Sequence, residues 1–276
     1  MTSSSLDGAD GVTLSFREWP GDTDRSVLAL HATGFCKEVW EPVAAALSAQ
    51  GVRVVAIDQR GHGASSLPVP LGDWWGLGRD AAVVARELGP FTIGLGHSSG
   101  ATAATMTNLL EPGQLPYLVL AEPVVFPKGT GYDAALAEQA RWRRDSFDSA
   151  DEARRHFEGR GIFARWESSA FDGYIVGGLR VSDDHVELAC RPETEAEFYE
   201  LGMNHGVWER LDELSVPVRL LVGEESTFHA GSFAVDQAAA YGAELTMVPE
   251  ADHFLPMQRP EVMVAAVMEA LESREA

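Results

Sequence analysis

The sequence predicts an α/β fold with a doubly wound, mostly parallel sheet. Short apolar runs rich in β-branched residues alternate with alanine-rich helical patterns along the first 121 residues. Continuous apolar runs of this kind are typical of parallel strands that are buried on both faces. Right-handed crossovers then place helices on both sides of the sheet and gather the chemistry at the carboxyl ends of the strands.

The predicted elements follow one another in a regular order. Strands are expected at residues 11–19, 26–31, 52–57, 91–96 and 117–121, and helices at 40–50, 78–88 and 101–110. The strand at 52–57 is followed by Asp58-Gln59-Arg60-Gly61-His62-Gly63, whose glycines favour a turn.

The alternation stops after Glu122. From about Pro127 to Arg210 there are charged helical patches and many aromatic residues but no clear strand, which predicts a mostly helical cap. The sheet pattern resumes at 216–222 and 244–248, and a last helix is expected at 259–271. The core domain is therefore predicted at residues 1–126 and 211–276, with the cap at 127–210 inserted after the sixth strand.

Composition limits the partners of this protein. A formal net charge of -21 over 276 residues repels phosphate backbones and anionic lipid headgroups, so we expect neither nucleic acid nor a membrane as partner. Cys36 and Cys190 make no disulfide framework, and the first residues lack the pattern of a secretory signal. We therefore expect a cytoplasmic protein, monomeric or homodimeric, that acts on a small molecule.

A nucleophile is predicted at Ser98. It lies in Gly96-His97-Ser98-Ser99-Gly100, between a predicted strand and a predicted helix. A serine in such a sharp turn has a strained backbone, and a Cβ at position 96 or 100 would crowd the flanking strand and helix. The helix N-terminus beside it favours developing negative charge.

A serine hydroxyl needs a base, and His253 is the best placed of the eight histidines. It lies between the last strand and the last helix, in a loop that opens at the carboxyl edge of the sheet. We expect His97 to line the floor of the site and His62 to organise its own turn. No histidine shows the spacing of a metal site, and no cofactor is expected.

These motifs together resemble the α/β-hydrolase superfamily. The resemblance rests on the loop from Asp58 to Ser65, the turn at Ser98 and the triplet Asp252-His253-Phe254. The family's oxyanion loop usually reads His-Gly-x, whereas this chain has His31-Ala32-Thr33-Gly34. The resemblance implies that the backbone N–H groups of Thr33 and Ser99 hold the oxyanion.

The acid of the triad is less evident. The family's common position is an aspartate shortly after the next-to-last strand, but this chain has Gly223-Glu224-Glu225-Ser226 there. In a second arrangement the acid ends the strand after the nucleophile helix, which here is Glu122. We favour Glu122, because a carboxylate at the end of an apolar strand needs a partner such as a histidine N–H. Glu225 and Glu224 remain alternatives, and Asp252 is expected to be a turn residue.

The segments around Ser98, Glu122 and His253 are similar to those of zearalenone-type lactone hydrolases. This resemblance raises lactones as candidate substrates. With Ser98 as nucleophile and His253 as base, we expect a serine hydrolase that cleaves a carboxylic ester or lactone through an acyl-enzyme, and the aromatic residues of the cap suggest an apolar or aromatic substrate. The same triad could also serve a carbon–carbon bond hydrolase or a thioesterase. In a third alternative, the fold serves a non-catalytic ligand-binding protein.

Overall fold

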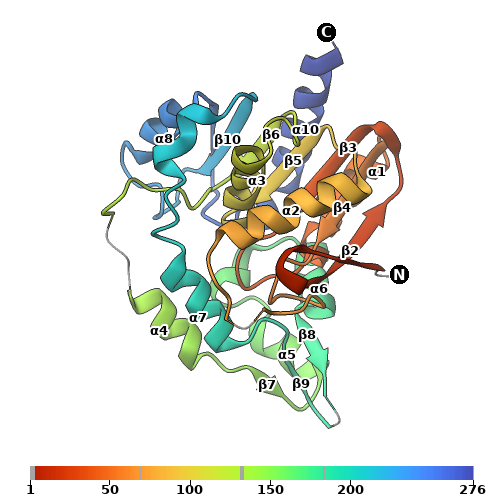
Figure 1. Ribbon diagram of the computed structural model, residues 1–276. Coiled ribbons are helices and arrows are strands. Elements are labelled where there is room, and N and C mark those ends of the chain that lie inside the picture. The colour runs from red at the N-terminus through yellow and green to blue at the C-terminus, as the bar shows by residue number, and fades with distance from the viewer. Residues whose placement is uncertain (1–3, 69, 131–133, 183, 276) are drawn as a thin grey trace.

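The computed structural model describes residues 4–68, 70–130, 134–182 and 184–275. Its main sheet has the strand order β1-β2-β4-β3-β5-β6-β10-β11 (Figure 1). In this order, every neighbouring pair from β4 onward is parallel. The pairs β1–β2 and β2–β4 are antiparallel. The strands are β1 (Ser4–Asp7), β2 (Thr13–Trp19), β3 (Asp22–Leu30), β4 (Val52–Ile57), β5 (Ile93–His97), β6 (Leu118–Ala121), β10 (Val218–Gly223) and β11 (Glu244–Val248).

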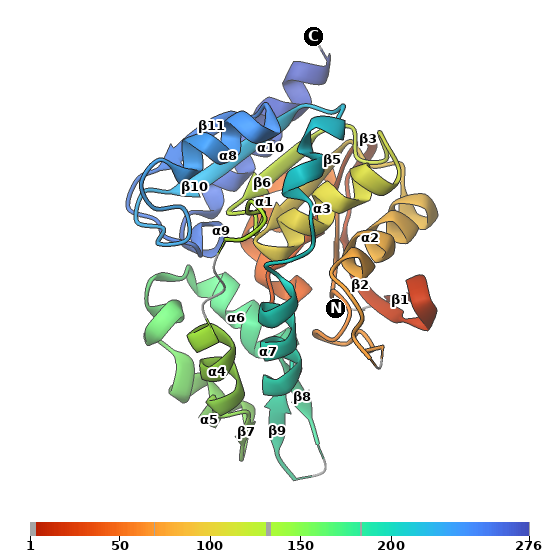
Figure 2. The same ribbon diagram turned by 60° about the vertical axis from the view of Figure 1, so that its left-hand side comes forward.

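Side chains of the central strands divide between two apolar cores. In β3, Val27 and Ala29 belong to one core while Leu28 and Leu30 belong to the other, because successive side chains of a strand point to opposite faces. Helices α1 (Glu41–Ser48) and α10 (Pro260–Glu275) cover the first face. Helices α2 (Trp75–Leu88), α3 (Ser99–Leu110) and α8 (Phe233–Tyr241) cover the second (Figures 1 and 2). The predicted doubly wound sheet is confirmed.

The segment 127–210, which we call the insertion, lies beyond one end of the main sheet in both views (Figures 1 and 2). Its helices are α4 (Ala134–Trp142), α5 (Ala150–Phe157), α6 (Ser168–Gly177) and α7 (Pro192–Leu201). It also contains a small antiparallel sheet of β7 (Ser146–Phe147), β9 (Val186–Leu188) and β8 (Leu179–Val181). The expectation of no strand here was wrong, because strands of two or three residues are too short to show an alternating pattern.

The insertion shares its apolar core with the main sheet. Phe163, Phe171 and Tyr174 belong to the same buried cluster as Phe35 and Trp40, which precede α1. Most aromatic residues of the insertion therefore pack as core. Its status as a separate domain stays a prediction.

The remaining helices are short. They are η1 (Ala9–Gly11), η2 (Lys37–Trp40), η3 (Gly161–Arg165), η4 (Trp208–Glu213) and α9 (Leu255–Gln258). Among the described residues, no helix combines the length and apolar character needed to cross a membrane. Cys36 and Cys190 are both buried and free.

Candidate active site

Ser98 lies in the sharp turn between β5 and α3. Its backbone has φ 54° and ψ -118°, a sparsely populated conformation with positive φ that costs a non-glycine residue about 1–3 kcal/mol. A Cβ added to Gly96 would lie 2.4 Å from the Cα of Ala101, and one added to Gly100 would lie 2.1 Å from the carbonyl oxygen of Leu30. Both positions therefore need glycine, as the sequence predicts.

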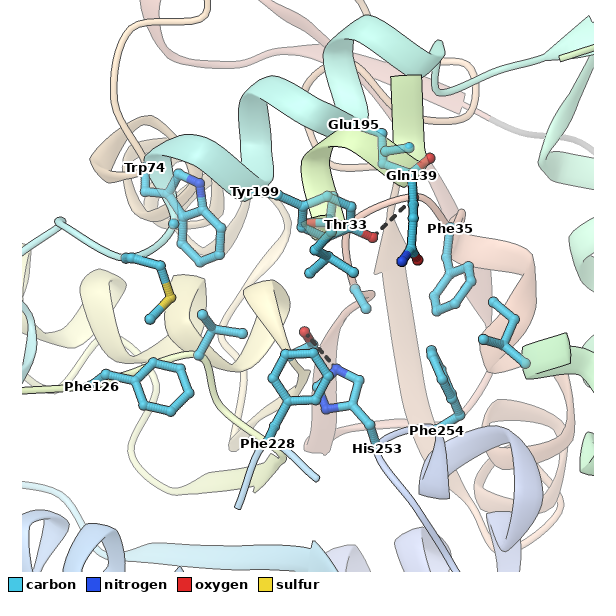
Figure 3. A pocket seen from close by; sticks show the side chains of 18 of the residues that line it. Thr33, Phe35, Trp74, Phe126, Gln139, Glu195, Tyr199, Phe228, His253 and Phe254 are labelled. Atoms are coloured by element: carbon cyan, nitrogen blue, oxygen red, sulfur yellow. Dashed lines mark hydrogen bonds between the residues drawn. The ribbon is translucent and has the colours of Figure 1, made fainter. Parts of the chain in front are cut away.

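Ser98, His253 and Glu122 form one chain of hydrogen bonds. The Oγ of Ser98 lies 3.1 Å from the Nε2 of His253, which is the hydrogen bond dashed at the ring of His253 in Figure 3. The Nδ1 of His253 lies 3.1 Å from the Oε2 of Glu122. His253 comes from the loop between β11 and α9, and Glu122 directly follows β6. The structure thus brings the three predicted residues together from segments that are far apart in the sequence.

Glu122 is fully buried and accepts several hydrogen bonds. Its Oε1 accepts the N–H of Gly223 at 2.8 Å, and its Oε2 accepts the hydroxyl of Ser226 at 2.6 Å and a ring N–H of His229 at 2.7 Å. Burial raises the pKa of this carboxyl, but the hydrogen bonds from His229 and His253 outweigh burial and hold its pKa well below the usual range. Glu122 is therefore an ionised carboxylate.

The other candidate acids lie elsewhere. Glu225 is exposed and pairs with Arg165 at 2.8 Å, and Glu224 is also exposed. Asp252 accepts the backbone N–H of Phe254 at 2.9 Å, so it closes a turn as expected.

The predicted oxyanion donors come from two segments of the chain. Ser99 is the first residue of α3, so its N–H has no acceptor within the helix. Thr33 follows β3 in the loop after His31, and it lines the same cavity as Ser98. Within the described part of the chain, no backbone carbonyl accepts either N–H group. Both groups are free to bind an oxyanion.

Two buried histidines hold the loop that contains Thr33. The Nε2 of His62 accepts the N–H of Gly34 at 2.9 Å, and the Nε2 of His31 accepts the N–H of Gln59 at 3.0 Å. Each Nδ1 donates to a backbone carbonyl, so both rings are neutral. Burial lowers the pKa of His31 to about 4 and that of His62 to about 3. His62 therefore holds the loop that contains Thr33 as well as its own turn.

A cavity of about 440 Å³ opens beside Ser98. Aromatic side chains contribute to its wall, and in Figure 3 Tyr199, Glu195 and Gln139 lie across it from His253. Tyr199 is the one aromatic residue of the insertion's described part that lines it. The aromatic lining is Phe35, Trp74, Phe126, Tyr199, Phe228 and Phe254.

A comparison with protein families matches residues 27–266 to the family described as "Alpha/beta hydrolase family". The chain belongs to this family. A search of curated proteins finds no match to this hydrolase.

Among solved structures, the hydrolase is similar to E-2-(acetamidomethylene)succinate hydrolase, with TM-score 0.85 and 22% identity over 98% of this chain and 99% of the other. It also resembles a thermophilic esterase from Thermogutta terrifontis, with TM-score 0.73 and 18% identity over 99% of both chains. The thioesterase domain from the curacin biosynthetic pathway has TM-score 0.74 and 21% identity over 97% and 99%. At these identities the likeness concerns the fold alone.

Two histidines of the hydrolase have positions that the sequence does not reveal. His97 is not among the residues that line the cavity, contrary to expectation; its Nε2 instead donates to the carbonyl of His253 at 2.7 Å. The contact of His229 with Glu122 is not predicted either. His229 belongs to no motif, and the one available signal is its position after β10, near the family's common acid position.

Proposed function

We propose that this protein is a serine hydrolase that cleaves a carboxylic ester or lactone with an apolar or aromatic group. One observation carries the proposal: the hydrogen-bonded chain of Ser98, His253 and Glu122 meets an aromatic cavity at the Ser98 hydroxyl. In this proposal Ser98 is the nucleophile, His253 the base and Glu122 the acid.

The first half of the reaction forms an acyl-enzyme. The Oγ of Ser98 attacks the substrate carbonyl while the Nε2 of His253 takes the hydroxyl proton, and the N–H groups of Thr33 and Ser99 bind the oxyanion. The bond to the leaving alkoxide then breaks, and His253 returns its proton to that oxygen. Glu122 stabilises the imidazolium through the Nδ1–H of His253.

The second half releases the acid. Water attacks the acyl carbonyl as His253 takes one of its protons, and the carbonyl–Oγ bond breaks with return of that proton to Ser98. For a lactone the alcohol and the acid are the two ends of one product. In both halves, the Nε2 of His253 takes the proton from the nucleophile, which is first Ser98 and then water. It returns that proton to the leaving oxygen, which is first the alkoxide and then the Oγ of Ser98.

The charge of the cavity supports a neutral substrate. Arg143 lines the cavity, but its guanidinium pairs with Glu195 at 2.5 Å and donates to the hydroxyl of Tyr174 at 3.0 Å. Tyr199 also donates to Glu195, at 2.9 Å. Because Glu195 neutralises this arginine, a substrate carboxylate gains little there, and the net charge of -21 repels anions further.

The experiment is hydrolysis of a panel by the wild type and by Ser98→Ala. The panel holds p-nitrophenyl esters of increasing chain length, aryl lactones and macrocyclic aryl lactones, the last because of the motif resemblance to zearalenone-type lactone hydrolases. Turnover of an ester or lactone that is lost in Ser98→Ala supports the proposal. Ser232→Ala, which removes an exposed hydroxyl, is the matched control.

Other outcomes would favour the alternatives. Turnover of acyl thioesters alone points to a thioesterase, and turnover of diketones alone points to carbon–carbon bond hydrolysis. Labelling of Ser98 by a fluorophosphonate without turnover of any substrate points to a non-catalytic binding protein. Any of these results contradicts the proposed ester or lactone cleavage.

A further inference from the structure

A second histidine contacts the acid of the proposed triad. His229 lies in the loop between β10 and α8 and is 4% exposed. Its Nδ1 is 2.7 Å from the Oε2 of Glu122, closer than the Nδ1 of His253 at 3.1 Å. Two imidazole rings therefore share one carboxylate oxygen, although the proposed triad needs only His253.

Gln237 fixes the proton on the far side of the His229 ring. The amide nitrogen of Gln237 donates to the carbonyls of Pro123 at 3.2 Å and Val125 at 2.8 Å, so its amide oxygen faces the ring. That oxygen is 3.0 Å from the Nε2 of His229. An amide oxygen accepts and cannot donate, so the Nε2 of His229 carries a proton.

Glu122 fixes the proton on the near side. An ionised carboxylate only accepts hydrogen bonds, so a bare Nδ1 at 2.7 Å would place two acceptors against each other. The Nδ1 of His229 therefore carries a proton as well. With hydrogen on both ring nitrogens, the side chain is an imidazolium.

We propose that His229 is held as a buried imidazolium against Glu122 and that its charge lowers the basicity of His253. This inference rests on the proposed function, and it makes His229 a positioning residue that acts through Glu122. Both Nδ1 atoms bond the same oxygen, so these two nitrogens lie at most about 6 Å apart, within range of strong charge interaction. The positive charge on His229 offsets part of the attraction of Glu122 for a protonated His253.

The surroundings of His229 allow this effect to be isolated. Its titratable contact is Glu122, which also bonds His253. The other groups around the ring are the neutral Gln237 from α8 and the aromatic rings of Phe126 and Phe233. Among the described residues, no cluster of His, Cys, Asp or Glu has an arrangement that could hold a metal ion.

The first test is direct and needs no substrate. In the ¹⁵N spectrum of the histidine rings of the wild-type protein, recorded at pH 7, both nitrogens of His229 are expected at the imidazolium position. His229→Gln identifies the signals by their loss. His205 is the internal control, because its Nδ1 accepts the N–H of Val207 and must be bare. A bare nitrogen on His229 at pH 7 overturns the proposal.

The second test measures the consequence for Ser98. A fluorophosphonate forms a bond from phosphorus to the Oγ of Ser98, fluoride leaves, and the hydroxyl proton passes to His253. The rate therefore falls at low pH, where His253 is already protonated. In His229→Gln this acidic limb is expected to shift upward by about one to two pH units, whereas in His205→Gln it stays in place.

The results separate the two proposals. If His229→Gln does not fold, the spectrum of the wild type still decides the charge state. An unshifted acidic limb in a folded His229→Gln overturns the effect on His253. Failure of all panel substrates, with a doubly protonated His229 and a shifted labelling profile, contradicts the proposed function and leaves this inference standing.

Discussion

Replacing Glu122 by glutamine tests the proposed acid most sharply. The substitution keeps the size of the side chain and removes its negative charge. When Ser98 attacks, His253 becomes an imidazolium whose Nδ1 is 3.1 Å from the carboxylate. At an effective dielectric constant of about 20, that attraction is worth roughly 5 kcal/mol, which corresponds to about 10⁴ in kcat.

The charge of His229 reduces this figure. If the buried ring of His229 loses its proton together with its counterion, Glu122→Gln is also relieved of a repulsion between the two rings. Across about 6 Å that repulsion is about half of the attraction, so the net loss is the other half, or around 10²-fold. A wrong tautomer of His253 beside the amide adds to the loss. We therefore expect Glu122→Gln to lower kcat by a factor between about 10² and 10⁴.

The assay is kcat for the best panel ester, measured on variants whose thermal unfolding shows that they are folded. That check is needed because loss of Glu122 leaves His229 without its buried counterion, which is destabilising. Glu225→Gln and Glu224→Gln are the matched controls and should keep activity within about threefold, since both side chains are exposed. A loss below tenfold in Glu122→Gln, with a large loss in Glu225→Gln, would refute the assignment.

Three other predictions follow from the site. Ser98→Ala should lower kcat by roughly 10⁵ to 10⁶ in the same ester assay, and a loss below tenfold would sink the nucleophile assignment. Gly100→Ala places a Cβ 2.1 Å from the carbonyl oxygen of Leu30, so it should lower the free energy of unfolding in urea by about 1–3 kcal/mol and reduce kcat. The free energy of unfolding should also fall as the pH drops from about 6.5 to 4. Burial lowers the pKa of His31 to about 4 and that of His62 to about 3, so the unfolded chain binds protons there that the folded chain does not, by up to about 1.4 kcal/mol per pH unit for each ring.

Each of these predictions has an outcome that would contradict it. For Gly100→Ala the comparison is Gly113→Ala, where an added Cβ meets nothing within 4 Å and only the cost of φ 80° remains; equal effects on kcat would show that the contact with Leu30 is unimportant. For the pH series, a free energy of unfolding that stays constant between pH 7 and 5 would show that the two rings are not held neutral by the fold.

Local sequence determines much of this protein. The strand at 52–57 is predicted at its observed bounds, because a buried parallel strand is a continuous apolar run that a turn ends. The nucleophile turn is equally local, since Gly96, Ser98 and Gly100 meet its steric requirements within five residues. His253 could be placed because the carboxyl edge of a parallel sheet gathers the loops that follow its strands.

Only the tertiary structure shows which of the three carboxylates contacts His253, and only it reveals His229 beside that carboxylate. The sequence offers Glu122, Glu224 and Glu225 on neighbouring strand ends, and their difference is burial: the first is enclosed while the other two reach solvent. The contact between His229 and Glu122 joins residues 107 positions apart through a loop without a motif. Periodicity and spacing record which face of an element is buried, but a hydrogen bond between two loops depends on where packing places both of them.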